Sequence, residues 1–325
     1  MSAPVAAPLA PAGRSLAVDL LKIAMAIFVI GIHANPFWRV YPDASLVTGD
    51  GLFRLAVPVF LVVNGYYFLP QAEQGRGWAY VRRIVSLYVL WSLLYLPLSW
   101  RDYWVQSPGG LVVLILNGYW HLWYLSSLAL AAALAVLIHR WSSGWMMAAV
   151  AITFLGGIAM SALIAWQVIP VYGPIVGSGD ILHRNGLLLS LPFFAIGMLM
   201  RRHDLPARVP MGRVAWLAAL GVALIPVESI LWRILPPQGV PHDNMLVLGL
   251  AAPMVVALAL KIPGAGRSRN LGLYANGLFF THIAVCGPLF RWTTLPKEVI
   301  FVLTVAGAFA LTWGIIRSGL AKRLL

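Results

Sequence analysis

Residues 16–35 read LAVDLLKIAMAIFVIGIHAN, and within this run only Asp19, Lys22 and His33 can carry a charge. A helix needs about 20 mostly apolar residues to cross the hydrocarbon core of a bilayer. The run therefore predicts a membrane-spanning helix rather than a helix in the core of a soluble protein. It decides the fold class because segments of the same character recur along the whole chain.

The composition agrees with a membrane protein. Of the 325 residues, 61% are hydrophobic and 10% are charged, whereas soluble domains carry roughly 25% charged residues. So few charges cannot cover the surface of a soluble protein of this size, so the bilayer must solvate much of the chain. We predict an all-α, polytopic transmembrane bundle of about ten helices, with spans at 16–35, 52–69, 80–98, 111–138 (a lead-in over 111–118 and a span over 121–138), 145–166, 186–200, 213–231, 244–261, 271–290 and 298–317.

The domain organisation is simple. Residues 1–13, rich in Ala and Pro, are expected to form a disordered N-terminal tail, and residues 14–325 a single transmembrane domain. A cleaved signal peptide is the alternative for the start, with residues 23–32 as its apolar stretch. Its cleavage site, Ile32-His33-Ala34, would place a bulky residue where a small one is needed. Cys286 is the only cysteine, so no internal disulfide can form.

The basic residues predict the orientation. If the N-terminus is cytosolic, 15 Lys and Arg residues fall in inner segments and 7 in outer ones, while Lys22 lies within the first span. Inner loops carry such an excess in membrane proteins. Both termini are therefore expected in the cytosol. The net charge of +13 fits contact with anionic lipid headgroups. The sequence has no basic domain outside the predicted spans, so a nucleic-acid partner is not expected.

The first span carries three ionisable residues on one helical face. At about 100° per residue, Lys22 lies about 60° and His33 about 40° around the axis from Asp19. His33 lies about 16 Å further along the axis than Lys22. Ionisable groups inside a membrane are costly and usually functional, although all three could instead be anchors at the two interfaces.

Further polar residues fall in the outer halves of other spans. Arg54, His121, Glu228 and His282 lie there on four different helices, as His33 does on the first. Such convergence predicts a polar cavity open to the outside, in which a histidine could act as a base near neutral pH. Single groups of this kind could also be interfacial side chains, and three histidines could bind zinc. The sequence has no serine elbow, metalloprotease helix or phosphate loop.

Six segments of the sequence form a recognisable series. They are Arg14 to Lys22 with His33 after ten more residues, Phe53 to Tyr66 with Asn64-Gly65, Arg82-Arg83, His121 to Leu125, Leu191 to Gly197, and Tyr274 to His282. Together they resemble acyltransferase family 3, a family of membrane proteins that acylate carbohydrates and related acceptors. The likeness runs from Arg14 to about Leu289, and Asn64 stands where serine is commoner in the family.

The resemblance implies a cytosolic acyl-CoA donor, commonly acetyl-CoA, and an acceptor outside the cell membrane. It implies His33 as the catalytic base, with Asp19 and Lys22 beside it on the same face. Lys22, Arg82 and Arg83 would bind the phosphates of CoA. The predicted residues for shaping the acceptor pocket are Arg54, Asn64, His121, Tyr124, Glu228 and His282.

The function expected from these observations is an O-acyltransferase of the bacterial inner membrane that acts on a glycan or lipid-linked sugar. No metal and no permanently bound cofactor is expected, since acyl-CoA is a co-substrate. The expected partners are acyl-CoA, the acceptor and membrane lipids, and association with further copies of the chain stays open. The rival interpretations are a multi-pass transporter of a small polar or sugar-linked substrate and a purely structural membrane protein.

Overall fold

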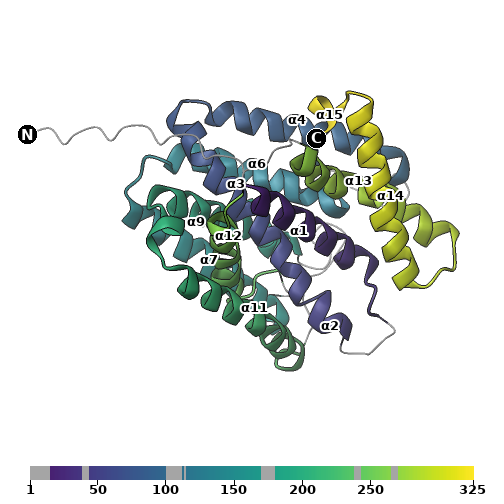
Figure 1. Cartoon of the computed structure of the whole chain (residues 1–325). Coiled ribbons are helices and arrows are strands. Elements are labelled where there is room, and N and C mark those ends of the chain that lie inside the picture. Colours follow the sequence, from purple (N-terminus) through teal and green to yellow (C-terminus); the bar gives the residue numbers. More distant parts are fainter. Residues whose placement is uncertain are drawn as a thin grey trace, which may run out of the picture.

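The computed structural model describes residues 15–38, 44–99, 112, 115–169, 180–237, 243–264 and 270–325. Within these ranges every regular element is a helix, which confirms the predicted all-α class (Figure 1). The predicted tail over residues 1–13 and three residues of the predicted lead-in (111, 113 and 114) lie outside the described residues. The main helices are α1 (Leu16–Ala34), α3 (Ala56–Glu73), α4 (Gly77–Ser99), α6 (Trp123–Ile138), α7 (Ser143–Ala165), α9 (Leu191–Arg202), α11 (Met211–Ile234), α12 (Leu248–Lys261), α13 (Asn270–Trp292) and α14 (Lys297–Arg317).

Short helical elements join or precede these helices. The short elements are α2 (Ala44–Thr48), the 3₁₀-helices η1 (Leu52–Leu55) and η2 (Trp120–Leu122), α8 (Asp180–His183), the π-helix η3 (Gly186–Ser190), α10 (Leu205–Arg208) and α15 (Ala321–Leu324). Three of them, η1, η2 and η3, lie directly before α3, α6 and α9.

Eight of the helical segments in the described ranges are long and apolar enough to cross a membrane. The other two predicted spans correspond to shorter helices. The predicted span 186–200 is a five-residue π-helix followed by α9, with 12 residues, and the predicted span 244–261 is α12, with only 14. At about 1.5 Å per residue, α12 covers roughly 21 Å of a hydrocarbon core about 30 Å thick.

The two short helices lie inside the bundle. Most side chains of α9 are buried, including Phe193, Phe194 and Met198. Those of α12 are largely buried as well. An apolar sequence predicts burial but does not say whether lipid or protein surrounds the helix. Because other helices enclose them, α9 and α12 need not match the thickness of the bilayer.

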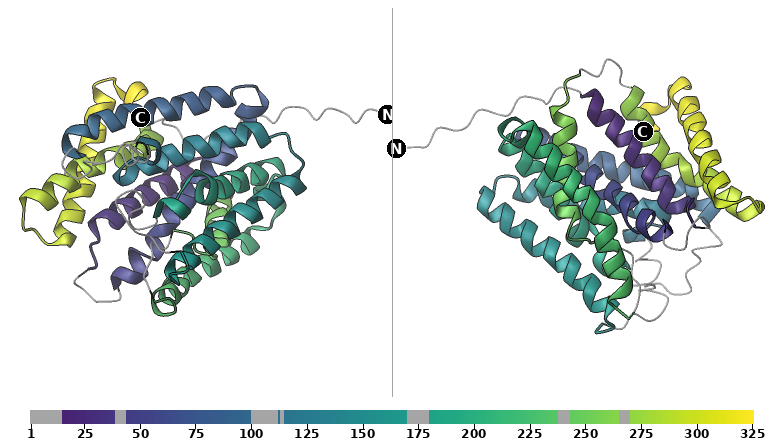
Figure 2. Two further views of the ribbon diagram at one scale, coloured as in Figure 1. Left: turned by 180° about the vertical axis from the view of Figure 1, so that it is seen from behind. Right: turned by 60° about the horizontal axis from the view of Figure 1, so that its bottom comes forward.

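α1 lies at the centre of the molecule. It packs against α3 and α12 on one side and against α13 and α14 on the other, and both Figure 1 and the right view of Figure 2 show it between these groups. The helix that carries Asp19, Lys22 and His33 is therefore surrounded by protein along much of its length. This arrangement lets its polar face line an internal site.

The helices α3 and α9 approach each other so closely that side chains are excluded at two points. A Cβ atom on Gly65 would lie 1.9 Å from the carbonyl oxygen of Phe194, and one on Gly197 would lie 2.1 Å from that of Val62. Only glycine lets two helix backbones approach to this distance. The contact fixes the position of α3, which carries Asn64 next to Gly65.

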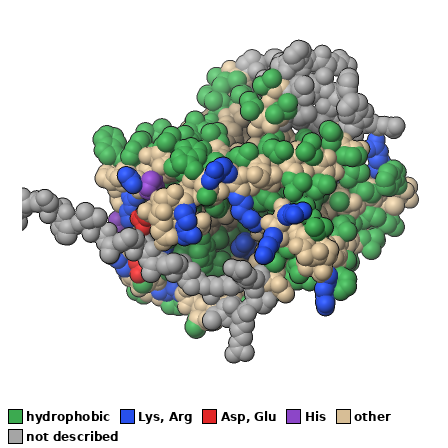
Figure 3. Space-filling view, turned by 90° about the horizontal axis from the view of Figure 1, so that it is seen from above, with side chains coloured by type: hydrophobic (Ala, Val, Ile, Leu, Met, Phe, Trp, Pro, Cys, Tyr) green, Lys and Arg blue, Asp and Glu red, His purple; other side chains and the backbone are tan. Residues whose placement is uncertain are grey.

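The outer faces of the peripheral helices are apolar. Ile152 on α7, Trp216 on α11 and Val302 on α14 are 72%, 62% and 62% exposed, and hydrophobic side chains cover much of the surface in Figure 3. Lipid tails are the environment that such faces fit. The chain is therefore a multi-pass membrane protein.

Candidate functional site

Three histidines from distant parts of the sequence meet inside the bundle. His33 comes from the last turn of α1, His121 from η2 and His282 from the middle of α13. The ring centre of His33 lies 6.4 Å from that of His121 and 5.2 Å from that of His282, and the rings of His121 and His282 are 4.7 Å apart. The structure thus brings together the three histidines that the sequence analysis singled out.

The backbone beside two of these histidines has an uncommon conformation. α1 ends at Asn35, whose φ of 47° is left-handed and whose side chain accepts a hydrogen bond from Ser45 Oγ at 2.9 Å. Trp120, directly before His121, also has a positive φ, of 50°. Such conformations cost about 1–3 kcal/mol and tend to occur at functional sites. Here they end α1 just after His33 and turn the chain into the bundle at His121.

The hydrogen bonds of His282 determine its tautomer. Its Nδ1 lies 2.7 Å from the carbonyl oxygen of Phe279 and 3.1 Å from that of Leu278. Carbonyl oxygens only accept, so Nδ1 carries the proton in the neutral ring and Nε2 carries the lone pair. Nε2 is buried, and none of the described residues hydrogen-bonds to it. His282 therefore presents a basic nitrogen within the histidine cluster.

Both ring nitrogens of His121 are buried too, again without a hydrogen-bond partner among the described residues. Leaving a buried polar atom unpaired costs about 1–3 kcal/mol. Such atoms are kept where a substrate group can pair with them. Within the described ranges no group of three His, Cys, Asp or Glu residues is arranged to hold a metal ion, so the geometry lends no support to the zinc alternative.

Two arginines stand beside the cluster in a network of ion pairs. Arg54 contacts Asp50 at 2.8 Å and Asp243 at 2.9 Å, and Arg184 contacts Asp180 at 2.8 Å and Asp243 at 3.5 Å. The charges of Arg54 and Arg184 both act on His33. Asp243 thus links η1 to the segment before η3 and holds both guanidinium groups near the histidines.

The ionisation of Asp243 follows from these contacts. Burial by itself would raise the pKa of its carboxyl group, but Arg54, Arg184 and His183 together outweigh burial and lower that pKa below its usual value. Sequence analysis found Arg54 but missed Arg184 and Asp243. The only local signal was the Asp180–Arg184 spacing of four residues, which favours an ion pair on a helix; nothing in the sequence links either residue to position 243.

Asn64 and Tyr124 are hydrogen-bonded to each other. Asn64 Nδ2 donates to the Tyr124 hydroxyl at 3.0 Å, and the hydroxyl of Tyr80 on α4 donates to Asn64 Oδ1 at 2.9 Å. The ring of Phe279 lies 5.2 Å from that of Tyr124 and 5.1 Å from that of His121. A hydrogen-bonded chain therefore runs from α4 through α3 to Tyr124 on α6, and the Phe279 ring packs between Tyr124 and His121.

Glu228 has a different surrounding from the one the sequence predicted. Its carboxylate accepts hydrogen bonds from the backbone N–H groups of Leu246 and Val247 at 2.6 and 2.7 Å, and from Trp232 Nε1 at 3.3 Å. It caps the start of α12, where free N–H groups attract negative charge. These contacts give the carboxylate a structural role at the start of α12. Its place in the acceptor pocket stays a prediction.

The remaining predicted residues lie toward the other end of α1 and on α4. Asp19 is buried and Lys22 half-buried, whereas Arg82 and Arg83 are exposed. Lys22 and His33 belong to one unbroken helix, which keeps them about 16 Å apart along its axis. Figure 3 shows the molecule from above, relative to the view of Figure 1. On this face, Lys and Arg side chains surround a hollow in the surface.

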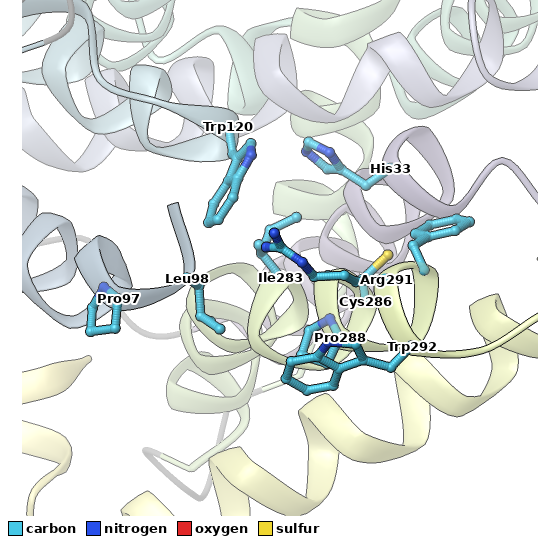
Figure 4. Close-up of a pocket in the computed structure, with 11 residues that line it drawn as sticks. His33, Pro97, Leu98, Trp120, Ile283, Cys286, Pro288, Arg291 and Trp292 are labelled. Carbon is cyan, nitrogen blue, oxygen red and sulfur yellow. The ribbon is translucent and has the colours of Figure 1, made fainter. Parts of the chain in front are cut away.

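A cavity of about 750 Å³ opens beside the histidine cluster (Figure 4). His33 contributes to its wall, together with Trp120 before α6 and the final turns of α13. Cavities of 300–1,000 Å³ are the usual size for small-molecule sites. A substrate in this cavity would therefore reach His33. The other lining residues are Pro97, Leu98, Ile283, Cys286, Gly287, Pro288, Phe290, Arg291 and Trp292.

Comparison with known proteins gives a family match over nearly the whole chain. The family model Acyl_transf_3, described as an acyltransferase domain, matches residues 15–317. The chain is also 27% identical over 208 residues to a serine/alanine racemase of Enterococcus gallinarum. The aligned region covers 59% of this chain and 30% of that protein. An amino-acid racemase of Enterococcus faecalis is 25% identical over 268 residues, or 76% of this chain and 37% of that protein.

The chain spans about a third of the length of the curated relatives that it matches. No solved structure matches it.

Proposed function

Because the chain belongs to acyltransferase family 3, we propose that it is a membrane O-acyltransferase that moves an acetyl group from cytosolic acetyl-CoA to a hydroxyl group on a glycan or lipid-linked sugar outside the membrane. We place it in a bacterial inner membrane, with both termini in the cytosol. The observation that carries the proposal is the meeting of His33, His121 and His282 beside a substrate-sized cavity.

His33 is the proposed base because it is the histidine of the cluster that lines the cavity. The acceptor oxygen attacks the thioester carbonyl while its proton passes to His33. The bond between the carbonyl carbon and sulfur then breaks, and CoA leaves as a thiolate that takes the proton back from His33. The products are the ester and CoA, and His33 is neutral again.

His282 orients His33 in this scheme. Its Nε2 lone pair, fixed by the two hydrogen bonds at Nδ1, can accept a hydrogen bond from one nitrogen of His33. The other nitrogen of His33 is then unprotonated and available to the acceptor hydroxyl. His121, Arg54 and the Asn64–Tyr124 pair shape the site around the reacting atoms.

The donor would enter from the opposite end of α1. Lys22, Arg82 and Arg83 are the proposed contacts for the phosphates of CoA, with the half-buried Lys22 nearest to the core. Three cations toward this end of α1 favour an anionic ligand there.

The test is acyl transfer by the purified protein in lipid nanodiscs, measured as release of the CoA thiol from acetyl-CoA. Mass spectrometry of the surface glycans of cells with and without the gene identifies the product. Loss of an acetyl mass from one glycan on deletion supports the proposal. An unchanged set of glycans together with no CoA release from the purified protein would reject it.

A second candidate function is the transport of a small polar substrate. It would use the same buried polar groups, and the matched relatives are named for racemisation of serine, alanine and other amino acids. Uptake of labelled serine or alanine into proteoliposomes, without any CoA release, would favour this alternative.

A further inference from the structure

Tyr95 is a buried residue of α4 that contacts the histidine site, although the proposed chemistry does not use it. Its side chain is only 2% exposed. Its ring centre lies 5.3 Å from that of His121 and 5.8 Å from that of Trp120, nearly at right angles to both rings. A buried tyrosine hydroxyl usually has a hydrogen-bond partner, and the partners of this hydroxyl lie on α13.

The hydroxyl of Tyr95 lies between two backbone groups of α13. It donates to the carbonyl oxygen of Phe280 at 2.5 Å and accepts a hydrogen bond from the N–H group of Ala284 at 3.2 Å. In a regular α-helix the N–H group of one residue donates directly to the carbonyl four residues before it, so these two groups are each other's usual partners. A side chain inserted at such a point is one of the recognised causes of a local distortion in a helix.

The same turn of α13 fixes the ring of His282. Its Nδ1 is bound to the two carbonyl oxygens directly before the one that Tyr95 holds. Trp91, one helical turn before Tyr95, stacks on the ring of Phe280, with ring centres 5.0 Å apart and an angle of 2° between the planes. α4 therefore holds both the side chain and the carbonyl group of Phe280, next to the turn that orients His282.

On the basis of the proposed acyl transfer, in which His282 orients His33, we infer that Tyr95 is a positioning residue. Its hydroxyl holds the turn of α13 that sets the place of the His282 ring. Because the rings of His282 and His33 lie 5.2 Å apart, a rotation of that turn changes the contact between them. Without the hydroxyl, the backbone groups of Phe280 and Ala284 can pair directly, α13 becomes more regular there, and His282 moves.

The first experiment observes His282 without acyl transfer. The protein is prepared with isotope-labelled histidine and measured by NMR in lipid nanodiscs, where the ring signals of His282 are assigned by their loss in His282→Gln. We expect Tyr95→Phe to shift these signals, because the ring keeps its packing while the hydroxyl between the two backbone groups is lost. Unshifted signals in a folded Tyr95→Phe protein would overturn the inference.

Tyr88→Phe is the matched control on the same helix. The hydroxyl of Tyr88, about two turns before Tyr95, also donates to a backbone carbonyl, that of Ile115 at 2.6 Å. Its removal should leave the His282 signals at their wild-type positions. A shift as large as that of Tyr95→Phe would show that the signals respond to any lost tyrosine hydroxyl on α4, and the inference would be rejected.

A second substitution covers the case in which Tyr95→Phe does not fold. Difluorotyrosine, introduced at position 95 by genetic code expansion, keeps the hydroxyl and its packing but makes it a stronger donor and a weaker acceptor. The bonds to α13 change in strength, so the His282 signals should again shift. Signals that stay at their wild-type positions would reject the inference.

The kinetic test separates positioning from substrate binding. With the glycan extract of the cell as acceptor, Tyr95→Phe should lower kcat by at least about tenfold, because a displacement of about 1 Å can cost about 10²-fold. The KM for acetyl-CoA should stay close to that of the wild type, and Tyr88→Phe should change neither constant. A rise in the KM with an unchanged kcat would contradict a positioning role.

A double-mutant cycle tests whether Tyr95 acts through His282. In a His282→Ala background, adding Tyr95→Phe should change turnover by less than about twofold, whereas independent residues would show the full loss again. The full loss in that background would reject the inference. If the wild type releases no CoA at all, the proposed acyl transfer fails, while the NMR comparison still decides whether Tyr95 positions His282.

Discussion

At the residue scale, the fixed tautomer of His282 supports different proposed tasks for the three histidines. His282 holds its proton at Nδ1 through two backbone carbonyls, whereas His33 lines the cavity. A base that must pick up a proton and return it needs access to substrate, which favours His33. A ring fixed by its own helix is better suited to orienting its neighbour.

We therefore expect His33→Ala and His33→Gln to lower turnover by about 10²–10⁴-fold, the usual contribution of a general base. An amide keeps hydrogen bonding but takes up no proton at neutral pH. The measurement is CoA release with the glycan extract of the cell as acceptor, together with acyl-CoA binding to show that the variants fold. His121→Ala and His282→Ala should be milder. A folded His33→Gln protein that keeps about a third or more of normal turnover would contradict the general-base assignment, and the ranking of the three variants would then identify the base.

Asp243 provides a second prediction, on stability and pH. Arg54 and Arg184 lower the pKa of its carboxyl group in the folded protein. Its contribution to stability is therefore complete above the unfolded pKa of about 3.9 and is lost as the pH falls through the lower folded value. Asp243→Asn should lower the thermal midpoint at pH 7, and the difference from the wild type should shrink below about pH 4. A difference that is the same at pH 3 and pH 7 would show that the charge of Asp243 does not matter.

At the scale of the elements, the contact between α3 and α9 is the most sensitive to added volume. Gly65→Ala would place a methyl group 1.9 Å from the Phe194 carbonyl oxygen, where backbone must move. Overpacking of this kind costs roughly 1–3 kcal/mol or more. Gly314→Ala on α14 is the matched control, since nothing lies within 4 Å of the place its methyl group would occupy. Thermal unfolding should show a marked loss for Gly65→Ala and little change for Gly314→Ala, and equal midpoints would contradict the close packing.

α1 also connects two substrates in the proposed reaction, because Lys22 and His33 stand about 16 Å apart along one helix. Lys22→Met should raise the KM for acyl-CoA more than the KM for the acceptor, since it removes a charge that would face CoA phosphates. Lys22→Arg, which keeps the charge, serves as the control. If only the KM for the acceptor changes, the assignment of Lys22 to acyl-CoA is wrong.

At the scale of the whole molecule, the 15 inner and 7 outer basic residues predict the orientation in the membrane. Residues after Arg202 and the C-terminal end at Leu325 should face the cytosol, while positions near Gly109 and Gly239, which lie outside the described residues, should face outward. In a Cys286→Ala background, a cysteine at position 205 should escape an impermeant thiol reagent in intact cells, and one at position 168 should react. Labelling of the cysteine at position 205 in intact cells would show that the predicted orientation is wrong.

The sequence by itself determined the properties that depend on local composition. Apolar runs such as 16–35 and 298–317 predict helices in a bilayer because backbone hydrogen bonds must be satisfied within each span, and α1 and α14 match them within a residue. The spacing of Lys22 and His33 is likewise fixed by the geometry of one helix. The costly polar residues could be found by type and depth alone.

Only the tertiary structure decided which of these groups meet. His33, His121 and His282 form a cluster because α1, η2 and α13 pack together, a long-range outcome that no local pattern encodes. The same packing sends Glu228 to the start of α12 and brings Asp243 to Arg54 and Arg184. It also lets α12 be short, because protein rather than lipid surrounds it. Burial and depth are readable from one segment of sequence, whereas partners depend on where every other segment lies.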